Sequence, residues 1–113
     1  MSTSRYLSVS DTARRFGVSV KALRIYETKG LVTPERTPAD WRVYGPDQIA
    51  RLQQVIALKS FGLSLARIGE LLSGRRIDLI RFLALHEAML RRQKAEVVRA
   101  LDLVAQARSK LAT

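Results

Sequence analysis

Residues 8–44 read SVSDTARRFGVSVKALRIYETKGLVTPERTPADWRVY, and this stretch decides the fold. Ser8 is a suitable N-cap for a short helix of about two turns, because apolar residues at helical spacing follow it. Gly17 ends this helix, since the residue after a short helix often needs a positive φ. Ser19 caps a second helix over about residues 20–28. The sequence therefore predicts two helices joined by a tight turn.

The second helix has an apolar inner face and a polar outer face. Helical spacing turns Leu23 and Tyr26 inward, and it turns Lys21, Arg24 and Glu27 outward. In a helix-turn-helix, this second helix is the one that enters the major groove of DNA. Its outer face is therefore the first place to look for DNA contacts.

A hairpin follows the two helices. Residues 33–40, TPERTPAD, contain two prolines and no apolar periodicity, so they form a loop or hairpin tip rather than a helix. Trp41–Tyr44 has the alternation and aromatic content of a strand. A helix-turn-helix with such a hairpin, or wing, places side chains in a DNA groove and grips the backbone on either side.

Three further helices are predicted after the wing. The first begins at Pro46, which suits an initial helical position, and runs to about Phe61. Ser64 caps a short helix that ends at residues 73–74, Ser-Gly. No glycine or proline occurs after Asp78, so the remainder is predicted to be one continuous helix. The expected fold class is mainly α with a small β-hairpin wing.

The long helix has a large apolar residue at every seventh position. The residue three positions after each of them is polar or small, as at Gln93 and Ala100. It would span about 50 Å, and one small domain cannot cover its apolar stripe along the whole length. We therefore expect residues 1–74 to form the DNA-binding domain and residues 75–113 a dimerisation helix that pairs with a second copy. An antiparallel pairing is allowed. The expected dimerisation residues are Leu83, Leu90, Val97, Leu101, Val104 and Leu111.

Charge and composition narrow the function. The formal net charge is +10, and residues 1–72 and 73–113 contribute +5 each, so the excess is not confined to a tail. Such an excess favours nucleic acid ahead of a membrane surface. The chain has no cysteine, which excludes disulfides and thiolate metal sites, and no metal or other cofactor is expected. No stretch approaches the roughly 18 consecutive apolar residues of a membrane-spanning helix, and the N-terminus lacks the apolar segment of a signal peptide. We therefore expect a cytoplasmic, nucleoid-associated protein.

Residues 15–72, RFGVSVKALRIYETKGLVTPERTPADWRVYGPDQIARLQQVIALKSFGLSLARIGELL, resemble the DNA-binding domain of the MerR family of bacterial transcription regulators. The resemblance implies a winged helix-turn-helix homodimer with an antiparallel coiled coil. It also implies a pseudo-palindromic operator inside a promoter, which the dimer bends and untwists so that RNA polymerase can engage both promoter elements. Effectors in this family bind near the end of the dimerisation helix or in an appended domain, and the effector here is unknown.

The resemblance also indicates which residues contact DNA. Arg24 and Tyr26 match the family's contacts on the second helix, and Arg42 and Tyr44 match its pair on the wing. Arginine offers a planar fork to phosphate or guanine, and a tyrosine hydroxyl can donate to a phosphate oxygen. The full set of candidate DNA contacts is Ser19, Lys21, Arg24, Tyr26, Arg36, Trp41, Arg42, Tyr44 and Lys59.

Each candidate has a structural alternative. Arg24 could face solvent or form an ion pair, Tyr26 could belong to the core, and Lys59 could simply be solvated. Trp41 could brace the wing rather than touch DNA. His86, the single histidine, is expected to be a packed interface residue rather than a ligand. The pair at residues 91–92, Arg-Arg, is expected to be a solvated face, with an acidic partner or a bent DNA flank as the lesser alternative.

Two departures from the family limit what the chain can sense. Metal-sensing and redox-sensing members use cysteines, so no mercury, copper, zinc or iron–sulfur site of that kind is expected. Drug-sensing members have a C-terminal effector domain, whereas this sequence stops at Thr113. It is either a small member without a sensor or the DNA-binding part of a longer ligand-sensing regulator. An architectural, excisionase-like DNA-bending factor is the other alternative, and enzymatic activity is not expected.

Overall fold

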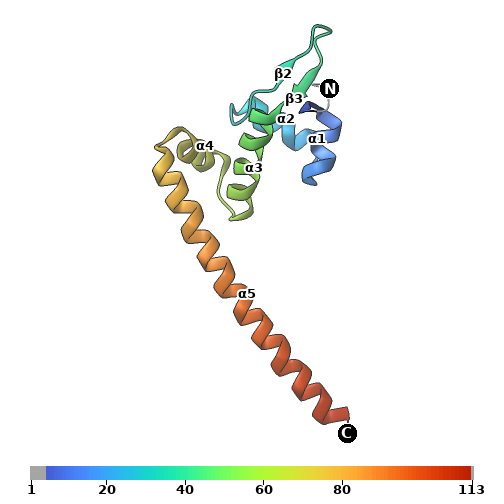
Figure 1. Ribbon diagram of the computed structural model, residues 1–113, viewed down its shortest axis with the longest axis vertical. Coiled ribbons are helices and arrows are strands. Elements are labelled where there is room, and N and C mark those ends of the chain that lie inside the picture. Colours follow the sequence, from blue (N-terminus) through green and yellow to red (C-terminus); the bar gives the residue numbers. More distant parts are fainter. Residues whose placement is uncertain (1–4, 113) are drawn as a thin grey trace. The chain divides into compact units, whose positions relative to one another are not determined.

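The computed structural model describes residues 5–112 (Figure 1). Residues 1–4 and Thr113, which the expected domain ranges include, lie outside the described residues. The chain divides into two compact units, residues 1–74 and residues 75–113. The mainly α fold with a small sheet and a long C-terminal helix is confirmed. In chain order the elements are β1 (Leu7–Ser8), α1 (Val9–Phe16), α2 (Val20–Thr28), β2 (Glu35–Arg36), β3 (Arg42–Tyr44), α3 (Pro46–Ser60), α4 (Leu65–Ser73) and α5 (Arg76–Ala112).

Serine caps and one left-handed glycine build the α1–turn–α2 motif. The Ser8 hydroxyl accepts a hydrogen bond from a backbone N–H in the first turn of α1 at 3.1 Å. Ser19 caps α2 in the same way, with its hydroxyl 2.9 Å from the Ala22 nitrogen. Gly17 has φ +66°, a conformation that costs glycine little and that ends α1 in a tight turn. The predicted helices and caps are therefore confirmed.

The wing belongs to a three-stranded antiparallel sheet with strand order β1-β3-β2. β3 pairs with β2 through Glu35 and Val43, and with β1 through Leu7 and Tyr44. β1 was not predicted from the sequence, because two residues are too few to give an alternating pattern. Trp41, which was expected to belong to the strand, lies just before it. The helices of the same unit lie at the base of the hairpin (Figure 1).

Much of the core of the first unit is aliphatic and comes from α2, α3 and α4. Leu23 of α2, Leu52 of α3 and Ile68 of α4 are fully buried. Arg51 holds the segment after α2 against α3, because its Nε donates to the carbonyl of Leu31 at 2.8 Å. This bond leaves the carbonyl satisfied although Leu31 is buried.

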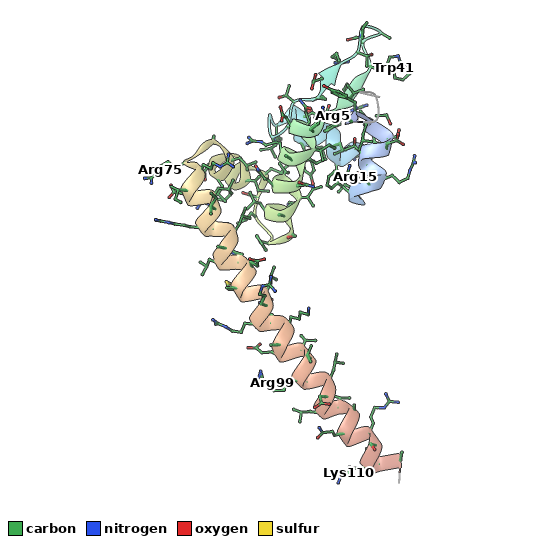
Figure 2. The ribbon with its side chains drawn as sticks, in the orientation of Figure 1. Arg5, Arg15, Trp41, Arg75, Arg99 and Lys110 are labelled. Carbon is green, nitrogen blue, oxygen red and sulfur yellow. The ribbon has the colours of Figure 1, made fainter. Side chains whose placement is uncertain are left out.

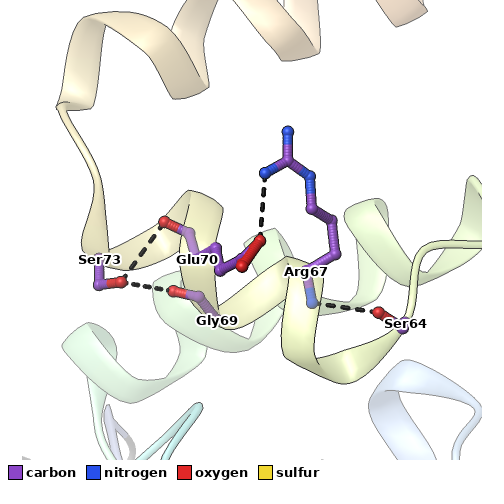
Figure 3. A network of polar contacts seen from close by, with 5 residues as sticks. All are labelled: Ser64, Arg67, Gly69, Glu70 and Ser73. Atoms are coloured by element: carbon purple, nitrogen blue, oxygen red, sulfur yellow. Dashed lines mark hydrogen bonds and ion pairs between the residues drawn. The ribbon is translucent and has the colours of Figure 1, made fainter.

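Polar contacts define α4 at both ends (Figure 3). The Ser64 hydroxyl accepts from the Arg67 backbone N–H at 3.1 Å, which confirms the predicted N-cap. The Arg67 guanidinium donates to Glu70 at 3.2 Å on the exposed surface. The Ser73 hydroxyl donates to the Gly69 carbonyl at 2.7 Å in the last turn. These bonds complete a helix of nine residues between two turns.

A buried carboxylate joins α2 to the wing. Glu27 Oε2 accepts a hydrogen bond from the hydroxyl of Tyr44 at 2.6 Å, and Glu27 Oε1 lies 3.4 Å from Arg42 Nε. The Glu27 side chain is 13% exposed, so the prediction that it faces outward is wrong. Burial first, and then the Glu27 carboxylate, raise the pKa of Tyr44 above its usual range, while Arg42 opposes this weakly. Tyr44 therefore remains a protonated donor.

The second unit is the single helix α5, which extends over 37 residues. None of its described residues is buried. It begins at Arg76, slightly earlier than the glycine- and proline-free stretch suggested. Between residues 5 and 112, none of the helices combines the length and the hydropathy that a membrane-spanning helix requires.

Replacing Glu27 with glutamine should lower the free energy of unfolding by about 2 kcal/mol, because it leaves the half-buried Arg42 guanidinium without its counter-charge. Urea unfolding at one fixed protein concentration measures this change. Glu35→Gln is the matched control, since Glu35 is exposed on β2, and its effect should stay within about 0.5 kcal/mol. Equal effects of the two substitutions would show that the Glu27 carboxylate contributes no more to stability than an exposed one.

Candidate nucleic-acid interface

A groove of about 400 Å³ separates α2 from the wing. The α2 wall contributes Val20 and Arg24, and the N-terminal end of α1 closes one side with two serines. The opposite wall comes from β2, the hairpin tip and β3. Four of the nine candidate DNA contacts therefore line one groove, and they are Arg24, Arg36, Trp41 and Arg42.

Arg24 is the groove's cation on the helix side. Its side chain is exposed, and it forms no ion pair or hydrogen bond with another described residue. The alternative of an intrachain ion pair is therefore wrong for this structure. An unpaired guanidinium offers five N–H donors in a planar fork. This fits recognition of a phosphate or of a guanine edge.

The hairpin tip presents a cation and an indole ring. The Arg36 guanidinium donates to the Asp40 carbonyl at 3.0 Å and lies 3.6 Å from the Asp40 carboxylate. Asp40 itself has φ +66°, which turns the chain at the tip. Trp41 is 72% exposed and extends from the hairpin (Figure 2). The alternative that Trp41 braces the wing against the core is therefore wrong.

Arg42 is held from behind while it lines the groove. Its side chain is 20% exposed, and its Nε is buried beside Glu27 without the alignment of a hydrogen bond. The contact is thus an ion pair rather than a hydrogen bond. The Glu27 carboxylate fixes the direction of the guanidinium and ties it to α2.

Three other candidates lie outside the groove. Ser19 and Lys21 are exposed in the N-terminal part of α2, where a helix-turn-helix meets base edges. The hydroxyl of Ser19 is already used as the cap of α2. Lys59 is exposed in the last turn of α3, with its Nζ 3.4 Å from the Leu63 carbonyl.

The two candidate tyrosines are not surface residues. Tyr44 is fully buried and donates its hydroxyl to Glu27, so the expected direct contact of this phenol with DNA is incompatible with its position. Its role is to hold β3 against α2. Tyr26 is buried as well, in agreement with the alternative that it belongs to the core.

The structure adds residues that the sequence did not single out as site residues. Ser8, Val9 and Ser10 line the groove from the start of α1. Ser8 was identified only as a helix cap, and its nearness to the wing depends on the unpredicted β1–β3 pairing. A second cavity of about 350 Å³ lies between α1 and the start of α3, with Arg5 and Arg15 in its lining (Figure 2). Both arginines add positive charge to this unit.

The expected dimerisation residues lie on α5. Leu83 is half-buried, and the others are exposed although all are large and apolar. Val97 and Leu101, for example, are 58% and 64% exposed. His86 lies among them, with its Nδ1 2.9 Å from the Phe82 carbonyl and its ring stacked on the Phe82 ring. Within residues 5–112, no cluster of three metal-ligating side chains occurs.

Comparisons with known proteins agree with this architecture. A family model described as "MerR HTH family regulatory protein" matches residues 7–75. The transcriptional regulator BrlR of Pseudomonas aeruginosa is 36% identical over 93 residues, which cover 77% of this chain and 34% of BrlR. The HTH-type transcriptional regulator CueR of Escherichia coli is 31% identical over 97 residues, which cover 85% of this chain and 68% of CueR.

A solved structure extends the likeness to the long helix. The HTH-type transcriptional regulator SkgA from Caulobacter crescentus superimposes with a TM-score of 0.74 and 28% sequence identity, covering 96% of this chain and 78% of that chain. The chain spans about a third of BrlR, so BrlR has sequence outside the matched region. These relatives are regulators, which is consistent with the expectation of a non-enzymatic protein. Because the family model matches more than half of the sequence, the chain belongs to the MerR family of helix-turn-helix transcription regulators.

Proposed function

We propose that the protein is a sequence-specific transcription regulator that binds as a homodimer to a pseudo-palindromic operator inside a promoter. The dimer bends and untwists the operator, and RNA polymerase responds to the altered shape of the promoter. The free energy needed to bend and untwist DNA depends on its sequence, so base pairs that the protein does not touch also contribute to specificity. No effector and no cofactor form part of this proposal.

The single observation that carries the proposal is the groove between α2 and the wing. It brings Arg24 together with Arg36, Trp41 and Arg42, from two elements that flank a DNA backbone in winged helix-turn-helix proteins. The chain's net charge of +10 supports a polyanionic partner. In this proposal α2 recognises the base sequence, and the wing contacts the DNA backbone.

Homodimerisation is supported by the exposed apolar residues of α5. Six large aliphatic side chains recur on one side of α5, and five of them are exposed whereas Leu83 is half-buried. Soluble proteins rarely leave so long an apolar stripe uncovered, and a second copy of the helix covers it most simply. The alternation of large and small residues permits close approach of an antiparallel partner.

Mapping the bound sites across the genome, followed by footprinting, tests the regulatory role. We expect each site to be a pseudo-palindrome between the two elements of a promoter, since a two-fold dimer matches a two-fold site. Gel mobility of duplexes with the site at different positions then measures the bend. Sites without symmetry and away from promoters would instead favour an excisionase-like architectural factor.

Arg24→Ala should abolish the preference for the operator over a scrambled duplex. A bidentate arginine–base contact provides about 1–3 kcal/mol of discrimination, and the dimer has two such arginines. Fluorescence anisotropy with both duplexes measures the preference. Arg14→Ala is the control, because Arg14 is exposed on α1 and already paired with Asp11 at 3.4 Å. An unchanged preference in Arg24→Ala would contradict the assignment of α2 to the groove.

Arg42→Ala should weaken binding to operator and scrambled duplexes alike. Loss of a phosphate contact also reduces the dependence of log Kd on log salt concentration, by about 0.9 per contact. Titrations at several salt concentrations provide both quantities. Circular dichroism confirms that the variant is folded, since Arg42 also pairs with Glu27. A loss confined to the operator would assign Arg42 to base recognition instead.

Val97→Asp should convert the dimer to a monomer, whereas Val98→Asp should not. The two valines are 58% and 57% exposed, so they differ in the face of α5 that they occupy and hardly in exposure. A carboxylate placed in the apolar seam must be desolvated on dimerisation, which opposes assembly. Multi-angle light scattering at micromolar concentration measures the mass. A wild-type monomer would exclude the proposed assembly altogether.

A further inference from the structure

A second pattern lies on the side of α5 away from the seven-residue repeat. Arg81, Leu85 and Arg92 are followed at identical spacing by Arg99, Leu103 and Lys110. The two triplets are 18 residues apart, which is five helical turns, so they share one face. At 100° per residue the six side chains fall within about 40° of one another, and roughly 150° from the apolar seam. We call these six residues the basic–leucine stripe.

The four charged residues of the stripe are all basic, and Glu96, four residues after Arg92 and three before Arg99, is the acid that borders it. Arg81, Arg92 and Arg99 are exposed and form no ion pair with any other residue between 5 and 112. Off the stripe, Arg91 is paired with Glu87 at 3.2 Å, as is usual for a solvated helix face with mixed charges. In Figure 2, Arg99 and Lys110 leave the same side of α5. The stripe therefore has an excess of positive charge that Glu96 alone does not balance.

The two leucines of the stripe are the second observation. Leu85 and Leu103 are 61% and 60% exposed, and they lie about 27 Å apart along the helix axis. They are on the wrong face to be covered by a partner helix at the seam. DNA phosphates could pair with the arginines, but they offer no apolar surface on which these leucines could be buried. The combination fits an acidic protein surface that also offers apolar side chains.

We propose that the basic–leucine stripe binds an acidic amphipathic helix of another protein, in which carboxylates surround two large apolar side chains at matching spacing. The proposal rests on the proposed dimer, because the seam must be occupied for the stripe to be the face that remains available. The leucines supply the apolar burial, and the arginines orient the partner and speed its association. Recognition then follows the helix-in-groove mode, with anchors at helical spacing.

The test uses the full-length chain and a synthetic helical peptide as the probe. The peptide has two leucines 18 residues apart, with glutamate four residues before and seven residues after each leucine. Two matched peptides replace either both leucines with alanine or all four glutamates with glutamine. Fluorescence anisotropy measures their affinities. We expect the first peptide to bind at least tenfold more tightly than either matched peptide.

Paired variants locate the binding surface. Arg92→Gln with Arg99→Gln, and separately Leu85→Ala with Leu103→Ala, should each weaken binding of the first peptide at least tenfold. Arg75→Gln with Arg91→Gln removes the same charge off the stripe and should leave the affinity within twofold, as should Val98→Ala. Light scattering and operator binding are measured for every variant. Retained dimer and operator binding with lost peptide binding separates this proposal from the proposed function.

Two outcomes would overturn the proposal. Equal binding of the leucine and alanine peptides would reduce the stripe to unspecific charge attraction. A lower salt dependence of DNA binding in Arg92→Gln with Arg99→Gln, together with unchanged peptide affinity, would assign the stripe to flanking DNA.

Discussion

The buried carboxylate of Glu27 is the constraint on which the DNA-binding unit depends. It accepts the hydroxyl of Tyr44 and pairs with Arg42, so α2 and β3 are held by one side chain. A half-buried charge is costly unless it is compensated, and here both carboxylate oxygens have partners. This contact therefore connects the two elements that form the opposite walls of the groove. Arg42 consequently reaches the groove in a fixed direction rather than as a free surface arginine.

The same contact separates the residues that shape the groove from those that can touch DNA. Tyr44 and Tyr26 hold the elements in place from within, whereas Arg24 and Trp41 remain open to a ligand. The Arg36–Asp40 pair at the hairpin tip offsets the one carboxylate on the groove wall. The groove thus presents net positive charge although the unit contains several acidic residues. This arrangement is the basis of the proposal that α2 recognises the sequence and the wing contacts the DNA backbone.

Local signals in the sequence predicted most of the fold. Serine caps and a glycine with positive φ act within a few residues, so Ser8, Ser19, Ser64 and Gly17 could be read directly. Nonlocal contacts could not. Glu27 faces inward because it binds the hydroxyl of Tyr44, which lies 17 residues later in the chain. The spacing of residues within α2 cannot predict such a contact. The short strand β1 likewise exists only because β3 pairs with it, and that pairing brings the start of α1 to the groove.

The long helix poses the opposite problem, since its sequence pattern is clear but none of its described residues is buried. Most of the stability of helices in proteins comes from packing of an apolar face, and the proposed second copy of α5 would supply such packing. Two patterns with different chemistry share this helix. The seven-residue apolar repeat suits an identical helix, whereas a row of cations would repel its own copy. The basic–leucine stripe is therefore unsuited to self-association, which is why a partner of opposite charge fits it.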